Sequence, residues 1–243
     1  MGIGEEFFRK TCYAAMPQPP QALGQPHPPL ELPAPEGAAR VDLPNPGELR
    51  IQPVDFRSIL EGRRSLRHYQ PQALSLDELS YLLWLTQGVK EVTSRPSTLR
   101  PVPSAGARHA FETYLLANRV ENLPAGLYRF LAGTHQLAEL DTRPEITELL
   151  TAACDHKQPV RGGAVVFFWV AVQERMFYRY GERGYRYLLL DAGHICQNLY
   201  LAAESIGCGA CAIGAFDDLK LNAELGLDGR SLFVTYLAAV GKR

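Results

Sequence analysis

The sequence predicts an α+β fold, because its strands and helices follow one another in an irregular order. Residues 111–117 and 125–131 predict two strands joined by a turn, and residues 164–172 (AVVFFWVAV) predict a strand buried on both faces in mid-sheet. A long helical region follows at about 182–206. The regular alternation that a doubly wound fold requires is not found. The remaining expected elements are helices at 75–87, 144–152 and 217–226 and a closing strand at 232–240.

The helix at 75–87 has the clearest boundaries. Ser75 followed by Glu78 makes a capping-box sequence, in which each side chain accepts a hydrogen bond from the other residue's backbone. Gly88 marks the end of the helix. Its apolar stripe comprises Leu79, Leu82, Leu83 and Thr86.

The helix at about 182–206 is apolar nearly all round. A helix that is apolar on two faces is buried on two faces, so we expect it to lie in the core and also to meet a second subunit. His194 lies within it and is expected to be a hydrogen-bonded core or interface residue. One stripe comprises Leu188, Ala192, Ile195, Leu199 and Ala202, and the other comprises Leu189, Cys196, Tyr200 and Ala203.

Residues 1–53 form a proline-rich arm that precedes the predicted domain at 54–243. Most prolines lie between 17 and 53, so this segment cannot be helical for long. It is either a disordered tail or an extended arm laid across the domain or a partner subunit. Spaced apolar residues favour the arm, namely Leu23, Leu30, Leu32, Val41, Leu43 and Ile51.

The charge balance argues against nucleic acid and membrane as partners. The chain has 25 Lys and Arg against 26 Asp and Glu, so any anion site must be local. The longest apolar run is about half of what a spanning helix needs. The start MGIGEEFF lacks the features of a signal peptide, and the five cysteines are typical of a reducing compartment. We therefore expect a soluble, cytoplasmic protein.

The RRSLR motif holds the candidate anion-binding residues. In an extended segment Arg63, Ser65 and Arg67 share one face, whereas Arg64 and Leu66 point the other way. Two guanidiniums and a hydroxyl can donate charge-assisted hydrogen bonds to a phosphate. The alternative is a solvated basic turn.

Two loops of small residues and the C-terminus can complete such a site. The loops PVPSAGARH and IGAF let the backbone approach a flat ring and donate N–H groups to it, although both can be ordinary tight loops. The last strand, if docked, would aim the two terminal cations inward, whereas a frayed end would not. The residues concerned are Pro103, Ser104, Ala105, Gly106, Gly214, Ala215, Lys242 and Arg243.

The sequence contains no motif typical of other common classes of enzyme. The sequence has no GxSxG, HExxH, Walker loop or GxGxxG, which argues against a serine hydrolase, a zincin, a P-loop enzyme and a Rossmann dinucleotide site. The CGAC pair at 208–211 has no second pair for zinc and does not begin a helix, so buried structural thiols are favoured. We expect no metal site.

Several stretches together resemble the nitroreductase superfamily, and more narrowly its SagB-type branch, which includes azoline dehydrogenases of thiazole/oxazole-modified peptide pathways. The YGERGYR…GHICQNLYLAA block is specific, whereas the arginine motif alone is weak. The resemblance runs in family order from about residue 57 onward. Its stretches are RRSLRHYQPQALSLDELSYLLWLTQG, PSAGARHAFETYLL, AGLYRF, YGERGYRYLLLDAGHICQNLYLAAESIGCGACAIGAFDD and LAAVGKR.

The resemblance implies a nitroreductase-like fold with a mixed sheet flanked by helices, an intertwined homodimer, and FMN at the subunit interface. It implies that the FMN phosphate is bound by the arginine–serine motif and the C-terminal cations, and that the two small-residue loops lie against the flavin. The residues so assigned are Arg63, Arg64, Ser65, Arg67, Lys242 and Arg243 for the phosphate, and Pro103, Ser104, Ala105, Gly106, Gly214 and Ala215 for the ring.

Tyr180 is the candidate catalytic residue. Azole-forming relatives resemble one another in a Lys-Tyr pair before GERGYR that deprotonates the azoline ring, but this chain has Arg179-Tyr180. Arginine stays protonated near neutral pH and cannot act as a base, which leaves Tyr180 for that role.

Three functions remain open. The first is an FMN-dependent dehydrogenase of the SagB type that transfers hydride between flavin N5 and a small or peptidic, azoline-like substrate, in a complex with a cyclodehydratase. The second is an NAD(P)H-dependent reductase of nitro compounds or quinones. The third is a non-catalytic flavin-binding scaffold subunit.

Overall fold

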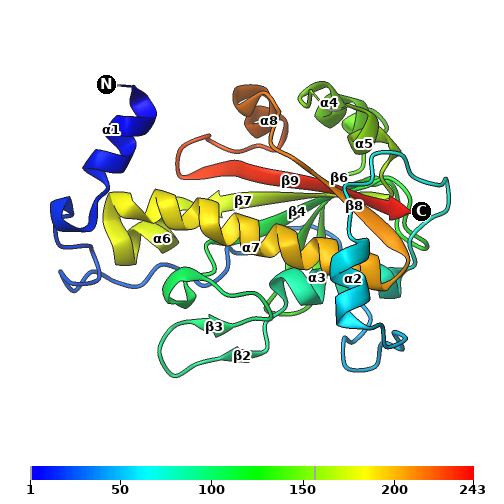
Figure 1. Cartoon of the computed structure of the whole chain (residues 1–243), viewed down its shortest axis with the longest axis horizontal. Helices are drawn as coiled ribbons and strands as arrows, with labels where there is room; N and C mark the ends of the chain where they lie inside the picture. The colour runs from blue at the N-terminus through cyan, green and yellow to red at the C-terminus, as the bar shows by residue number, and fades with distance from the viewer. Residues whose placement is uncertain (1, 156) are drawn as a thin grey trace.

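The computed structural model describes residues 2–155 and 157–243. Within them, seven strands form one sheet in the order β1-β6-β5-β4-β7-β9-β8, with helices on both sides (Figure 1). The α+β prediction is confirmed. The strands are β1 (Arg40–Asp42), β4 (Phe111–Ala117), β5 (Gly126–Leu131), β6 (Gln136–Asp141), β7 (Val165–Val172), β8 (Cys208–Ile213) and β9 (Leu232–Lys242), and β2 (Glu91–Val92) and β3 (Thr98–Leu99) form a separate ribbon. The helices are α1 (Ile3–Lys10), α2 (Phe56–Gly62), α3 (Leu76–Gln87), α4 (Ile146–Ala152), α5 (Lys157–Gly162), α6 (Gln173–Tyr180), α7 (Gly184–Ser205) and α8 (Asp218–Glu224).

The sheet is antiparallel between neighbouring named strands and becomes mixed at its β8 edge. There Ser65 pairs with Ala210 of β8 in parallel orientation, and the N–H of Leu66 donates to the carbonyl of Ala210 at 2.8 Å. The RRSLR motif is therefore extended where it meets the sheet, which is the condition under which Arg63, Ser65 and Arg67 share one face. The mid-sheet position predicted for β7 is also confirmed, because it lies between β4 and β9 with all its residues buried.

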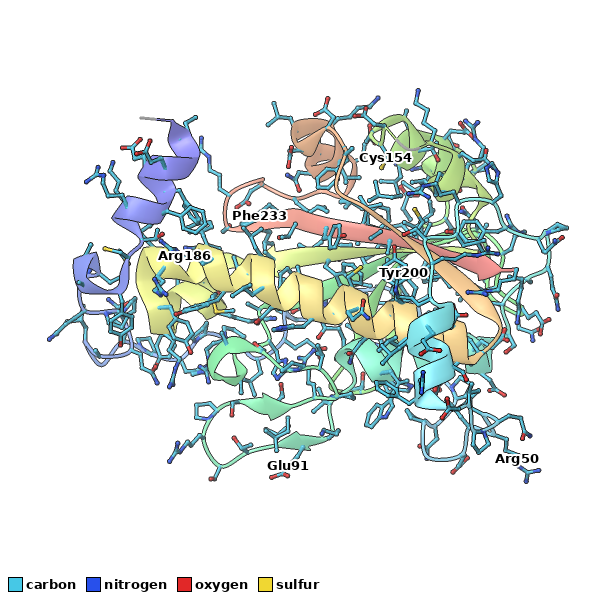
Figure 2. All side chains as sticks on the ribbon, viewed as in Figure 1. Arg50, Glu91, Cys154, Arg186, Tyr200 and Phe233 are labelled. Atoms are coloured by element: carbon cyan, nitrogen blue, oxygen red, sulfur yellow. The ribbon has the colours of Figure 1, made fainter. Side chains whose placement is uncertain are left out.

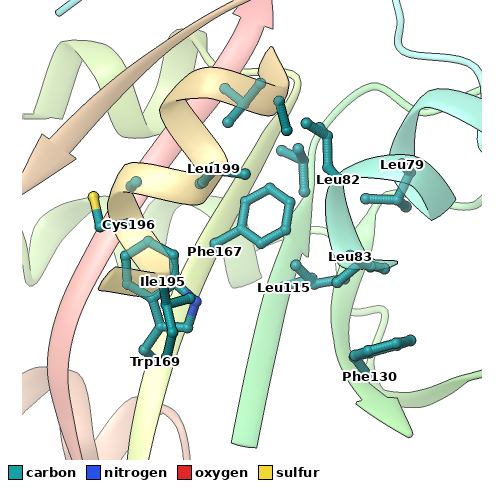
Figure 3. Close-up of a cluster of buried hydrophobic side chains, with 14 of the residues drawn as sticks. Leu79, Leu82, Leu83, Leu115, Phe130, Phe167, Trp169, Ile195, Cys196 and Leu199 are labelled. Atoms are coloured by element: carbon teal, nitrogen blue, oxygen red, sulfur yellow. The ribbon is translucent and has the colours of Figure 1, made fainter. Parts of the chain in front are cut away.

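Two apolar layers cover the two faces of the sheet, because neighbouring residues of β7 point in opposite directions. Phe167 and Trp169 join the layer made with α3 and α7, which Figure 3 shows. Val166 and Phe168 join the layer made with α4, α5 and α8. All four side chains are fully buried, so α7 is fixed firmly against one face.

Helix α3 begins and ends as predicted. Glu78 N–H donates to Ser75 Oγ at 3.1 Å, and Ser75 N–H donates to Glu78 Oε2 at 2.9 Å, which completes the capping box. A Cβ at Gly88 would lie 2.2 Å from Trp84 Cε3, so only glycine fits at this end. The predicted stripe of α3 is buried.

Helix α7 confirms one predicted stripe fully and the other in part. The stripe from Leu188 to Ala202 is buried, as are Cys196, Tyr200 and Ala203 of the other, but Leu189 is 61% exposed. His194 is exposed as well, so the prediction that it lies in the core is wrong. The helix buries one broad face and leaves the opposite one open.

The N-terminal arm lies along the outside of the domain, from α1 beside the start of α7 to β1 at the sheet edge (Figure 1). The carboxylate of Glu31 accepts the N–H of Ala132 at 2.5 Å, and Arg129 Nη2 donates to the carbonyl of Pro33 at 2.6 Å. Leu43 is buried, as expected of an anchor. Leu23 is 60% exposed, so the prediction that Leu23 anchors the arm is wrong. The other expected anchors, Leu30, Leu32, Val41 and Ile51, are half-buried.

A buried ion pair fastens the arm to the sheet. Arg175 Nη2 lies 2.5 Å from Glu112 Oε1, and the two side chains are 2% and 3% exposed. Arg175 Nε also donates to the carbonyl of Pro29 at 2.7 Å, and Leu32 N–H donates to Glu112 at 2.9 Å. Backbone groups of the arm therefore form hydrogen bonds with both members of the buried ion pair.

None of the helices in the described part of the chain combines the length and apolarity needed to cross a membrane.

Candidate functional site

The RRSLR motif is held by Tyr200, which Figure 2 shows on α7 beside α2 and β8. The hydroxyls of Ser65 and Tyr200 lie 2.9 Å apart, and the N–H of Ala212 donates to the Tyr200 oxygen at 2.8 Å. The guanidinium of Arg63 lies over the Tyr200 ring, 5.3 Å from its centroid. Arg63 and Ser65 therefore face the same aromatic residue, which the sequence analysis placed only in an apolar stripe.

The arginines of this motif carry charge that is not neutralised. In residues 2–155 and 157–243, no carboxylate lies within 4.0 Å of Arg63, Arg64 or Arg67. Arg64 and Arg67 are exposed. Burial raises the pKa of the Cys211 thiol on β8, and the charge of Arg67 opposes that shift. The donors at this edge are of the kind that a phosphate requires.

The C-terminal cations lie beside the motif but are already paired. Strand β9 carries the chain to its end, so the alternative of a frayed terminus is wrong. Lys242 Nζ contacts the carboxylate of Glu78, and Arg243 contacts that of Glu204. Glu204 lies 3.2 Å from the position of a Cβ at Gly62, directly before the motif. The net charge that these cations add is therefore smaller than the sequence alone indicates.

The loop that contains Ser104 and Ala105 is held from below by Asp191 of α7. Ser104 Oγ donates to Asp191 Oδ2 at 2.5 Å, and Ala105 N–H donates to Asp191 Oδ1 at 3.1 Å. Burial raises the pKa of the Asp191 carboxyl, although both hydrogen bonds oppose this. These polar groups point inward, while Pro103 and Gly106 stay exposed. Asp191 was not among the residues predicted from the sequence, where its only signal is a carboxylate within a largely apolar helix.

Tyr180 and the Gly106 loop are close together. Gly106 has φ +58°, and a Cβ there would lie 2.5 Å from the Tyr180 hydroxyl and 2.7 Å from Arg179 Cδ, so a larger residue would displace both. The Tyr180 ring packs edge-on against Tyr187 with centroids 4.6 Å apart. The structure thus brings the candidate catalytic residue to the loop predicted at the ring.

Gly214 and Ala215 directly follow β8, the strand that holds the RRSLR motif. Gly214 is exposed, whereas the carbonyl of Ala215 accepts the N–H of Asp155 at 3.1 Å. The backbone at Gly214 is consequently open to a ligand.

The predicted residues form two groups, each attached to α7. One group adjoins Tyr200, and the other adjoins Asp191, nine residues earlier and therefore about 14 Å away along the helix. Cationic donors and a serine hydroxyl lie at the first position, and small residues and the half-buried Tyr180 lie at the second. This arrangement fits an extended ligand with a phosphate at one end and a ring at the other.

The CGAC thiols are structural, as predicted. Cys208 and Cys211 are buried in β8, and burial raises the pKa of Cys208 to about 11, which disfavours the reactive thiolate. Among the described residues, no group of three or more His, Cys, Asp or Glu could hold a metal ion.

The Nitroreductase family model matches residues 60–242, so the chain belongs to a known class of protein. The chain is a member of the nitroreductase family. It is 32% identical to MJ1384 of Methanocaldococcus jannaschii, a protein named as a nitroreductase, over 70% of this chain and 84% of that one.

Two further relatives support the resemblance to the SagB-type branch. The trifolitoxin-processing protein TfxB of Rhizobium leguminosarum bv. trifolii and the microcin B17-processing protein McbC of Escherichia coli are each 30% identical over 56% of this chain. The matches span 39% of TfxB and 52% of McbC, so each covers only part of the relative.

Solved structures share the fold. A protein of Ralstonia eutropha JMP134 named as a nitroreductase has a TM-score of 0.67 at 24% identity, over 89% of this chain and 98% of that chain. A chain of the E. coli microcin synthetase McbBCD complex with bound truncated pro-MccB17 has a TM-score of 0.62 at 21% identity, over 99% and 91%. A Desulfovibrio desulfuricans protein in complex with FMN has a TM-score of 0.56 at 19% identity, over 78% and 87%.

Proposed function

We propose that this chain is an FMN-dependent oxidoreductase of the SagB type, acting on a small or peptidic, azoline-like substrate. The observation that carries the proposal is the pair of groups on α7: uncompensated arginines with Ser65 at one position, and the Gly106 loop with Tyr180 about 14 Å away. FMN, when bound, supplies a ring nitrogen that accepts or gives a hydride.

The residues of this chain suit that cofactor. Arg63, Ser65 and Arg67 hold its phosphate, and Lys242 and Arg243 flank them while paired to their carboxylates. The open backbone at Gly214 and the loop from Pro103 to Gly106 lie along its ring. Arg64 is exposed and adds positive charge beside Arg63 and Ser65. Ala215 fixes the backbone behind Gly214.

Tyr180 holds or moves the proton on the substrate atom next to the one that exchanges hydride. Its hydroxyl lies 2.5 Å from the position of a Cβ at Gly106, so it is beside the loop that we assign to the ring. Arg179 sits 5.7 Å from the centroid of the same ring and keeps a positive charge beside the phenol.

We also propose that the domain at 54–243 works as a homodimer and joins a cyclodehydratase. The exposed apolar side chains of Leu189 and Leu190 on α7 offer an interface for a second copy. McbC, a relative at 30% identity, is a microcin B17-processing protein, and the McbBCD complex holds a chain of the same fold.

A second candidate is an NAD(P)H-dependent nitro or quinone reductase. The match to MJ1384 and the arginine at position 179 favour it, because Arg179 cannot share proton abstraction with Tyr180. Anaerobic mixing of the purified protein with NADPH separates the two. Fast bleaching of a yellow protein identifies the reductase, slow bleaching favours the dehydrogenase, and a colourless protein that takes up no FMN contradicts both.

A further inference from the structure

A pocket of about 650 Å³ lies between the N-terminal arm and Tyr180. That volume suits a small organic molecule. The arm side includes Tyr13, Pro19 and Gln21, and the domain side is made by Arg179, Tyr180 and Arg183. This pocket therefore joins the candidate catalytic residue to a segment outside the family match at residues 60–242.

The arm is tied to the domain on both sides of the pocket. The N–H of Gln21 donates to the carbonyl of Tyr178 at 2.8 Å, and Arg183 Nη1 donates to the carbonyl of Thr11 at 2.8 Å. Arg183 also lies over the Tyr13 ring, 5.8 Å from its centroid. The pocket is thus a formed feature of the fold.

The pocket carries uncompensated positive charge. Across the described residues, no carboxylate lies within 4.0 Å of Arg179 or Arg183, and the guanidinium of Arg179 has only a 3.4 Å contact to Gln21 Oε1. Arg108 is a third cation close to Arg179, although it lines a neighbouring pocket and not this one: burial lowers its pKa, and the charge of Arg179 lowers it further. The negative end of the α6 dipole would favour one cation at the C-terminus of that helix, but it does not explain a cluster of three. In a chain of net charge −1 this excess is local.

We propose that this pocket binds an oxyanion of the reacting molecule, either a carboxylate or a phosphate, on Arg179 and Arg183. The apolar body of that molecule packs against Tyr13 and Pro19, beside Tyr180. Arginine at position 179 presents a planar fork that can hold two oxygens at once. This inference rests on the proposed function for the role of Tyr180, and it makes the arm a specificity-determining wall.

Calorimetric titration of the purified full chain with matched probes tests the proposal. The pair 4-nitrobenzoate and 4-nitrobenzamide differs in one carboxylate charge, and the pair NADPH and NADH differs in one phosphate. We expect the member with the additional anionic group, 4-nitrobenzoate or NADPH, to bind about tenfold tighter or more than its partner in at least one pair, and the pair that shows the preference identifies the oxyanion. The preference is expected to weaken as salt rises.

Variants locate the preference. Arg179→Gln and Arg183→Gln are expected to bring the ratio of affinities close to one, and Arg179→Lys to retain part of it. Arg186→Gln is the matched control, because Arg186 also holds the arm, through Thr11 at 2.7 Å and through Phe8, but does not line the pocket. Figure 2 shows Arg186 at the arm end of α7. This control is expected to keep the full preference.

The outcomes separate this inference from the proposed function. Equal affinities within both probe pairs, a preference that survives both glutamine variants, or one that does not change with salt would overturn the inference. The flavin spectrum of the same samples reports on FMN separately. Normal FMN content without a charge preference contradicts the pocket alone, whereas a charge preference without FMN uptake contradicts the oxidoreductase alone.

Discussion

The hydroxyl oxygens of Ser65 and Tyr200 lie 2.9 Å apart, although 135 residues separate them in the chain. The same tyrosine oxygen accepts the N–H of Ala212 on β8. One phenol therefore joins the RRSLR segment, α7 and the edge strand of the sheet. The groups that we assign to the FMN phosphate are positioned by a residue that does not itself carry charge.

Replacement of Tyr200 by Phe removes this junction. We expect Tyr200→Phe to weaken FMN binding by about 1 kcal/mol, the usual scale for one neutral hydrogen bond, in a fluorescence titration with FMN. Tyr81→Phe is the control, because Tyr81 makes a similar 3.1 Å contact to Ser205 of α7 away from the predicted site. Equal losses in the two variants would show that Tyr200 acts only through general stability.

Removal of a guanidinium from the RRSLR motif is expected to weaken FMN binding more than Tyr200→Phe does. Arg63→Ala and Arg67→Ala should each weaken FMN binding by about 1.5–3 kcal/mol, because each removes a charged hydrogen bond. Arg57→Ala tests for a nonspecific effect of charge, since Arg57 lies on the preceding helix α2. Its side chain is exposed to solvent and forms an ion pair with Glu61 at 2.8 Å. Unchanged FMN affinity in both motif variants would refute the assignment.

The buried pair of Glu112 and Arg175 is predicted to hold the arm in place. Glu112→Gln leaves the guanidinium of Arg175 buried without its counter-charge, so we expect a loss of about 3–5 kcal/mol in the free energy of unfolding. Glu148→Gln breaks the exposed pair with Arg161 and should cost less than about 1 kcal/mol. Urea denaturation measures both, and a similar small loss in the two variants would contradict the role given to Glu112.

His109 is expected to make the fold sensitive to acid. Burial, together with the charge of Arg100, lowers the pKa of His109 to about 3, whereas the unfolded side chain titrates near 6.5. The unfolded state therefore binds the proton first as the pH falls, and stability decreases. Between pH 7.5 and 5 the loss from this group is about 2 kcal/mol.

The variant His109→Asn isolates that contribution. Asparagine does not titrate, and it tolerates the φ of +42° at this position. Urea unfolding of both proteins at the two pH values should show a smaller acid-induced loss in the variant. Equal losses would mean that other groups cause the sensitivity.

Local sequence signals predicted much of the fold. The capping box of α3, the fully apolar strand β7 and the main stripe of α7 depend on neighbouring residues, so their patterns were visible in the sequence. Strand β6 and helix α6 were not predicted, because both are short and carry many polar residues. Leu189 was expected to be buried because it is apolar, yet periodicity does not say how far around α7 the neighbouring layer extends.

The sequence indicated which residue types belong to the candidate site, but it did not indicate which of them are in contact. The arginine–serine motif and the small-residue loops were visible from composition and resemblance. The contacts of Ser104 with Asp191 and of Ser65 with Tyr200 span 87 and 135 residues, so no local pattern reports them. The pairing of Lys242 with Glu78 also escaped prediction, because 164 residues separate the two in the chain.

Comparison of FMN with riboflavin tests the central claim most directly, because the two differ only in the terminal phosphate. In equilibrium titrations of the purified protein, FMN should bind at least about a hundredfold tighter than riboflavin, the scale of two charged hydrogen bonds. Arg63→Ala should shrink that ratio mainly by weakening FMN. Equal affinity for the two flavins, or no binding of either, would contradict the account.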